Sequence, residues 1–157
     1  FINSCKLNII MTIKPIKLIK YPILLISIML CISGIRWMIS DEPWILDQVA
    51  NEERLKMTFS DLFFISGNET LPDYLTQIYR FLGLYVLGIG SLILSFSSQK
   101  LLIIKLVRNR ILFVLGLLLI TNLIVAYYWI SSSHFIYLMW IAILLYLLSL
   151  YNSRLLK

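Results

Sequence analysis

The sequence predicts an all-α membrane protein: four transmembrane helices in an antiparallel bundle, with a partly helical acidic extracytoplasmic loop between the first two. Hydrophobic residues make up 60% of the 157 residues and charged residues only 14%, whereas about a quarter of the residues in soluble domains are charged. Four apolar runs are long enough to cross a bilayer. All eight carboxylates fall within residues 40–75, so the acid is confined to one connection.

The apolar runs set the element boundaries that we expect within a single domain. A helix needs roughly 20 apolar residues to span a hydrocarbon core of about 30 Å. The expected spans are residues 21–39, 76–97, 111–130 and 135–151. The other expected segments are the basic N-terminus 1–20, the acidic outer loop 40–75, the basic inner loop 98–110, the outer turn 131–134 and the basic tail 152–157.

The N-terminal region leaves two alternatives open. Met11 is a plausible start, so residues 1–10 are expected to be an upstream extension. Lysines precede the first apolar run, as they do in a cleavable signal peptide, but the run is long for one and no small-x-small cleavage site follows it. We therefore expect a retained helix.

Basic residues predict the orientation. The N-terminus, the inner loop and the tail together hold ten Lys and Arg and no acid, whereas the other side holds four. The positive-inside rule then places both termini in the cytoplasm and the acidic loop outside. We expect a bacterial plasma membrane, with an organelle membrane as the alternative. The same rule accounts for the formal net charge of +6. Nucleic acid is therefore not an expected partner.

The outer loop is expected to be an ordered cap. Ser40, Asp41 and Pro43 form a helix-start signal. Two apolar patches, around Trp44 and at residues 62–65, are too short to span the membrane. Such patches lie on the end of a bundle or in the headgroup layer. The loop is therefore predicted to fold back on the helices.

The second apolar run carries the most informative local pattern. Arg80, Gly83, Leu87 and Gly90 are three, four and three residues apart, so they share one helix face. Small residues on such a face let a neighbouring helix approach closely. We therefore predict that Gly83 and Gly90 are helix-packing positions.

Polar groups near the membrane provide candidate site residues. Arg36 and Arg80 are expected at the level of the loop carboxylates, where salt bridges with Asp41, Asp61 or Asp73 would fix the cap. The alternative is an anion or lipid-headgroup site organised by Arg80. A polar amide inside an apolar run bonds to another helix or binds a ligand. The candidate ligand-binding residues are accordingly Arg36, Arg80 and Asn122.

One stretch resembles a known group of membrane proteins. Arg80, Gly83, Tyr85 and Gly90 follow an Arg-x-x-Gly-x-Tyr-x-x-x-Gly arrangement with one additional residue before the last glycine. With the polar loop before it and two closely joined helices after it, this stretch resembles uncharacterised four-helix membrane proteins near the DoxX-like families. The resemblance implies a compact, mostly bacterial bundle with no established reaction. The acidic loop here is longer than is usual in that group.

The sequence offers little support for catalysis. Cys5 and Cys31 form no disulfide framework, and the single histidine, His134, cannot build a metal site of ordinary ligand number. No metal, cofactor or catalytic residue is expected. The leading hypothesis is a non-enzymatic accessory or assembly subunit of a membrane complex, with membrane lipids and other membrane subunits as partners. The alternative is a lipid or small-molecule binding or transport protein with a pocket under the loop, and an enzyme ranks third.

Overall fold

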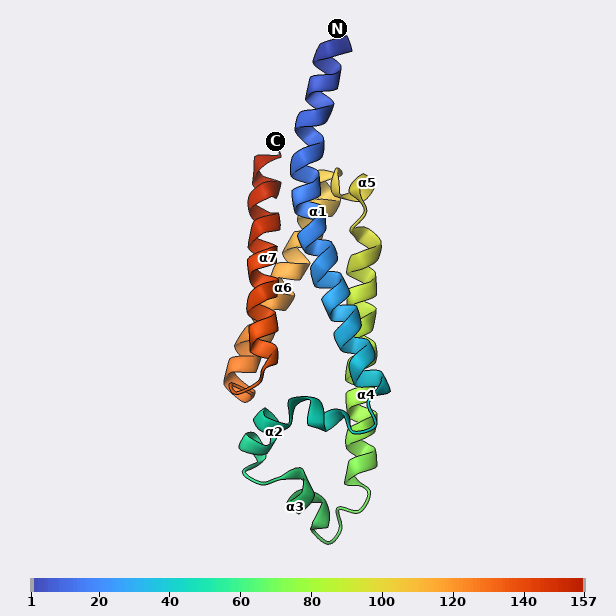
Figure 1. The fold of residues 1–157 in the computed structure, drawn as a ribbon, viewed down its shortest axis with the longest axis vertical. Coiled ribbons are helices and arrows are strands. Elements are labelled where there is room, and N and C mark those ends of the chain that lie inside the picture. The colour runs from blue at the N-terminus through green and yellow to red at the C-terminus, as the bar shows by residue number, and fades with distance from the viewer. Residues whose placement is uncertain (1, 157) are drawn as a thin grey trace.

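The chain is all-helical in the computed structural model, which describes the backbone of residues 2–156 and the side chains of residues 15–156. Four long helices lie along the long axis of the molecule (Figure 1). Shorter helices fill the connections on both sides of the second long helix. The elements are α1 (Ile2–Ile39), the 3₁₀ helix η1 (Pro43–Asp47), α2 (Gln48–Leu55), α3 (Phe59–Phe64), α4 (Leu71–Phe96), α5 (Gln99–Leu102), α6 (Lys105–Trp129) and α7 (Phe135–Leu155).

The prediction of four membrane-spanning helices in an all-α chain is confirmed. Four segments are long and apolar enough to cross a bilayer. They are Pro15–Ile39, Leu71–Phe96, Lys105–Trp129 and Phe135–Leu155. The protein is therefore an integral membrane protein.

The helices are longer than the apolar runs alone suggest. α1 extends to the N-terminal side of residue 21, and Ile16 and Ile19, which lie between the lysines, are buried in the core. Residues 105–110 belong to α6 rather than to a loop. Lys and Arg are good helix formers, so a basic segment can extend an apolar helix beyond the hydrocarbon region. The side chains of residues 1–14, within the expected basic segment 1–20 and including the expected extension 1–10, lie outside the described residues.

Helix α1 is the central element of the packing. It contacts both α4 and α7, and α7 in turn packs against α6. The main core cluster joins Ile19, Ile23 and Ile26 of α1 to side chains from α4, α5, α6 and α7. Ser149 of α7 donates a hydrogen bond from Oγ to the carbonyl of Ile19 at 3.1 Å. The order of contact is thus α4, α1, α7, α6.

The contact between α1 and α4 is built on glycines from both helices. A Cβ added at Gly83 would lie 2.7 Å from the carbonyl oxygen of Gly34, and one added at Gly90 would lie 2.9 Å from the Cys31 nitrogen. These distances are too short for any side chain, so the two backbones touch. Gly88 differs, since a Cβ there would meet nothing within 4 Å. We call this contact, which involves Cys31, Gly34, Gly83 and Gly90, the α1–α4 seam.

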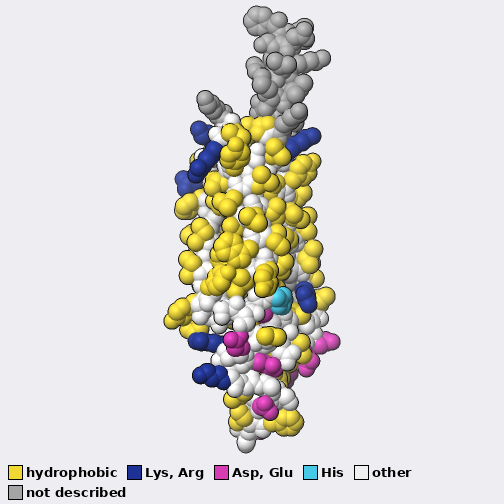
Figure 2. Space-filling model, turned by 60° about the vertical axis from the view of Figure 1, so that its left-hand side comes forward, with side chains coloured by type: hydrophobic (Ala, Val, Ile, Leu, Met, Phe, Trp, Pro, Cys, Tyr) yellow, Lys and Arg dark blue, Asp and Glu magenta, His cyan; other side chains and the backbone are white. Residues whose placement is uncertain are grey.

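The two ends of the molecule differ in structure and charge. η1, α2 and α3 lie together at one end, while α5 and the C-terminus lie toward the other (Figure 1). Asp and Glu side chains gather at the end that η1, α2 and α3 form, and apolar side chains cover the middle (Figure 2). We call residues 40–70 the cap, and the end near α5 the basic end.

Candidate functional site

An aromatic cluster holds the cap together. Trp44 of η1 is only 5% exposed. Its ring lies 6.3 Å from that of Phe59 and 5.4 Å from that of Phe63, centroid to centroid. Both partners come from α3, and a buried tryptophan removes a large apolar area from water. The cap therefore has a small core of its own.

A hydrogen bond links α2 to α3 and fixes the path between them. Oε1 of Glu52 accepts from the backbone N–H of Phe59 at 3.0 Å. Lys56, between the helices, takes a left-handed conformation with φ 57° and ends α2. Thr58 then caps α3, because its hydroxyl accepts from the backbone N–H of Asp61 at 3.0 Å.

The cap is bonded to the long helices at α4. Asn51 donates from Nδ2 to the hydroxyl of Tyr79 at 3.0 Å. The Tyr79 ring lies 6.4 Å from that of Trp37 at the end of α1, and Trp37 lies 5.3 Å from Phe135 at the start of α7. These contacts connect the cap to three of the four long helices.

A second set of contacts joins the cap to the connection between α6 and α7. Asp47, 9% exposed, lies 3.4 Å from Nδ1 of His134. Ser132 donates a hydrogen bond to Glu53. The guanidinium of Arg54 lies over the ring of Trp129 at 4.5 Å. The cap thus reaches across the ends of the bundle, from α4 to the α6–α7 turn.

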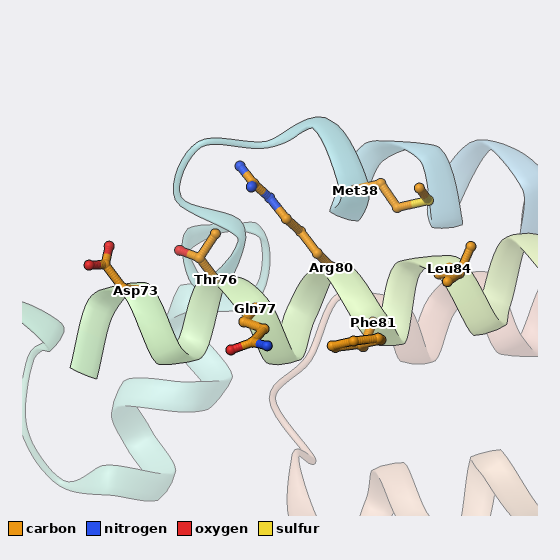
Figure 3. A pocket seen from close by; sticks show the side chains of 7 residues that line it. All are labelled: Met38, Asp73, Thr76, Gln77, Arg80, Phe81 and Leu84. Atoms are coloured by element: carbon orange, nitrogen blue, oxygen red, sulfur yellow. The ribbon is translucent and has the colours of Figure 1, made fainter. Parts of the chain in front are cut away.

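An open groove of about 470 Å³ runs along α4 beside the end of α1. Figure 3 shows Arg80 extending from α4 toward the loop that follows α1, with Met38 opposite Leu84. The groove combines polar and apolar side chains at the cap end of α4. Its lining residues are Met38, Asp73, Thr76, Gln77, Arg80, Phe81 and Leu84.

The expected salt bridges between arginines and the cap are not present. Among the side chains of residues 15–156, the acidic and basic groups that lie within 4.0 Å of each other are those of Asp47 and His134, at 3.4 Å. Asp61 instead accepts a hydrogen bond at Oδ2 from Thr58 Oγ1 at 2.7 Å, at the start of α3. Asp41 and Asp73 are exposed. Water solvates these carboxylates well, so an exposed ion pair offers little gain.

The three candidate ligand residues do not converge. Arg80 lines the groove, but Arg36 is exposed and does not line it. Asn122 is exposed on α6, where Nδ2 donates to the carbonyl of Leu118 in its own helix at 2.8 Å. No hydrogen bond from Asn122 to another helix is found among the side chains of residues 15–156. Of the three candidate residues, therefore, Arg80 alone lines the groove.

A turn before α4 stabilises an ionised carboxylate. Backbone N–H groups of Glu69 and Gly67 hydrogen-bond the Glu69 side chain and lower its pKa below the ordinary value. The Gly67 nitrogen lies 3.1 Å from Oε1. Gly67 has φ 94°, a conformation that suits glycine. The lowered pKa is thus a marker of an ordered turn between α3 and α4.

Arg108 has a role that the sequence did not indicate. It is 4% exposed, and its guanidinium donates from Nε to Ser153 Oγ at 3.0 Å and from Nη1 to the Leu102 carbonyl at 3.0 Å. The carbonyl of Ile103 is a further acceptor at 3.3 Å. Arg108 therefore ties α5 and α7 to the start of α6. In the sequence it cannot be told apart from the other basic residues of 98–110.

Few side chains in the part of the chain that the structure describes are grouped in a way that could bind a metal or a ligand. Within it, no group of three or more His, Cys, Asp or Glu side chains is arranged to hold a metal ion. The two notable arrangements there are the cap, with its exposed carboxylates, and the Arg80 groove beneath it. Both can recognise a partner by charge.

Comparison of the chain with protein-family models, with curated protein sequences and with solved structures finds no match. The resemblance to the DoxX-like group therefore stays a prediction.

Proposed function

We propose that the protein is a non-enzymatic accessory or assembly subunit of a membrane complex, and that its cap is the docking platform. In this proposal the four helices form an antiparallel bundle with both termini cytoplasmic, and the acidic cap faces outward. The platform would meet a basic or polar surface of another membrane subunit.

The observation that carries this proposal is the combination of order and exposure in the cap. The hydrogen bond from Asn51 to Tyr79 and the contact of Arg54 with the Trp129 ring hold it to the helix ends. Six of the eight carboxylates nevertheless remain exposed at that end: Asp41, Glu42, Glu53, Asp61, Glu69 and Asp73. The exposed carboxylates outnumber the two exposed basic residues of the cap, Arg54 and Lys56. An ordered surface with an excess of one charge sign steers association with an oppositely charged partner.

The cap also presents apolar side chains to its surroundings. Phe64 is 87% exposed and Val49 is 72% exposed. Exposed apolar groups rimmed by charge are typical of interaction sites. They also fit the headgroup layer, so the charge variants below are the more discriminating test.

The experiment is purification of the tagged protein from its own membranes in lipid nanodiscs. We expect a defined partner at fixed stoichiometry. The double variant Asp41→Asn, Glu42→Gln should weaken this association, because both carboxylates are exposed. The matched control is Lys100→Gln with Arg154→Gln, two exposed changes at the basic end that should leave the partner bound. Recovery of a lone monomer under several lipid conditions would overturn the proposal.

A second candidate function is binding of a lipid or small anionic molecule in the Arg80 groove. The observation that favours it is the Arg80 side chain, which lies along an open groove without an ion-pair partner among the described side chains. Arg80→Gln should then reduce crosslinking of short-chain phosphatidylglycerol to the residues that line this groove, whereas Arg36→Gln should not. Equal binding by both variants would remove this candidate.

A further inference from the structure

A second groove, of about 380 Å³, lies between α4 and α6 at the basic end. It is almost entirely apolar, and Arg110 is its one charged lining residue. Its walls come from the last turns of α4 and the first turns of α6. The lining residues are Leu92, Ile93, Phe96, Leu106, Val107, Arg110, Ile111, Val114 and Leu115.

The groove exists because α4 and α6 are held apart. α1 packs against α4 and α7, and α7 packs against α6, while α4 and α6 make almost no direct contact with each other in the described part of the chain. The short helix α5 connects them, and its Leu102 is fully buried in the core. Arg108 fixes the end of α5 through the carbonyls of Leu102 and Ile103. The space between the helices is therefore set by the fold.

The shape and polarity of the groove fit an amphiphile. Arg110 lies in the second turn of α6, near the end of the membrane span. Val114 and Leu115 continue along the same helix toward the membrane interior, opposite Leu92. A ligand with a charged head at Arg110 would place its apolar part along these side chains.

Charge complementarity identifies the head as an anion. No Asp or Glu follows Asp73 in the sequence. Neither the α5 region, nor α6, nor α7 can therefore supply a carboxylate side chain for Arg110. Lys100 and Lys105, both exposed, add positive charge to the same end. Basic pockets between membrane helices are suited to the headgroups of anionic phospholipids.

We propose that the α4–α6 groove is a binding site for one anionic phospholipid, whose phosphate contacts Arg110 and whose acyl chain lies against Val114 and Leu92. The lipid would fill the space that α4 and α6 leave open. This site is separate from the cap and does not depend on the function proposed for it.

The test uses photoactivatable phosphatidylglycerol with a diazirine in its acyl chain, in nanodiscs of phosphatidylcholine. We expect crosslinks in residues 92–96 and 106–115, and about fivefold less crosslinking there for Arg110→Gln, the loss expected for one basic side chain at an anionic lipid surface. Val114→Trp should also reduce it, because the added ring fills the groove while Arg110 stays. The same photoprobe with a phosphatidylcholine head should label these segments weakly.

Arg80→Gln is the matched control. It removes one exposed basic charge at the other end of α4, outside this groove, and should leave its crosslinking unchanged. Helix content and elution volume will show that all variants fold. Undiminished crosslinking in Arg110→Gln would overturn the anionic headgroup contact. Undiminished crosslinking in a folded Val114→Trp, or equal labelling by both headgroups, would overturn the site itself.

Discussion

The α1–α4 seam and the attachment of the cap show two different ways of joining parts of a membrane protein. In the seam, backbone meets backbone, and Gly34 and Gly83 leave no space for a single added carbon. The cap is attached by side chains, through the hydrogen bond between Asn51 and Tyr79 and the contact of Arg54 with the Trp129 ring. Lipid provides little hydrophobic force between helices, so close packing must supply the attraction. Outside the apolar region, amphipathic side chains such as Tyr79 and Trp129 can supply the attraction instead, because each has both an apolar ring and a polar group.

The largest expected effect lies in the small core of the cap. Trp44→Ala should remove about 3 kcal/mol of local stability, because it deletes a buried ring between Phe59 and Phe63. Hydrogen exchange should increase throughout α2 and α3 and stay slow in the long helices. Phe64→Ala, which truncates an exposed ring of the same cap, is the control and should change little. Equal exchange in both variants would show that Trp44 does not organise the cap.

The seam should respond to a single methyl group. Gly83→Ala is expected to cost about 2 kcal/mol, because the new Cβ would press on the backbone of α1. Gly88→Ala adds the same group on the same helix where nothing lies within 4 Å, and it should be neutral. Denaturation in mixed micelles of increasing SDS fraction measures both. Equal stability of the two variants would contradict the seam.

A smaller effect is expected where the cap meets α4. Tyr79→Phe removes the acceptor for the Asn51 amide and should loosen the cap by about 1 kcal/mol. The helices should be unaffected, since the ring itself remains. Tyr85→Phe, at a 69% exposed tyrosine of α4, is the control. We expect faster hydrogen exchange in α2 for Tyr79→Phe and not for Tyr85→Phe. Equal exchange in the two variants would show that the Asn51–Tyr79 hydrogen bond does not hold the cap.

The smallest effect concerns pH and the turn before α4. Hydrogen bonds from backbone N–H groups lower the pKa of Glu69 in the folded state. Their stabilisation is therefore complete above the ordinary pKa of 4.5 and is lost as the pH falls through the lower folded value. After correction for intrinsic rates, protection of the Gly67 amide should fall in acid. In Glu69→Gln, protection of the Gly67 amide should be weak and independent of pH. If protection in the wild-type protein did not fall in acid, the hydrogen bond from Gly67 to the Glu69 carboxylate would be contradicted.

Apolar runs predicted the four long helices because spanning a bilayer requires length and hydrophobicity that few other structures share. Spacing also identified the helix face with Gly83 and Gly90, but not its partner, because Gly34 and Cys31 form no comparable pattern. Salt bridges could not be predicted from charge alone. Exposed carboxylates such as Asp41 remain solvated by water. The charge of a residue also does not show how far its side chain lies from an oppositely charged one.

Arg108 and Arg110 show why site residues were harder to predict than helices. Two positions apart on a helix, they point in different directions, and only the fold decides which one is buried. Asn122 gave the opposite error, because an amide within an apolar helix can bond to its own backbone. Single residues depend on contacts that are distant in sequence.

The central claim is that the acidic cap and the basic end lie on opposite sides of the membrane, with the cap outside. It is tested most directly by labelling single cysteines in intact cells with a membrane-impermeant maleimide, in a Cys5→Ser, Cys31→Ala background. Glu42→Cys should be labelled in intact cells, whereas Lys100→Cys should be labelled only after the membrane is permeabilised. Labelling of both positions from the same side would contradict the account.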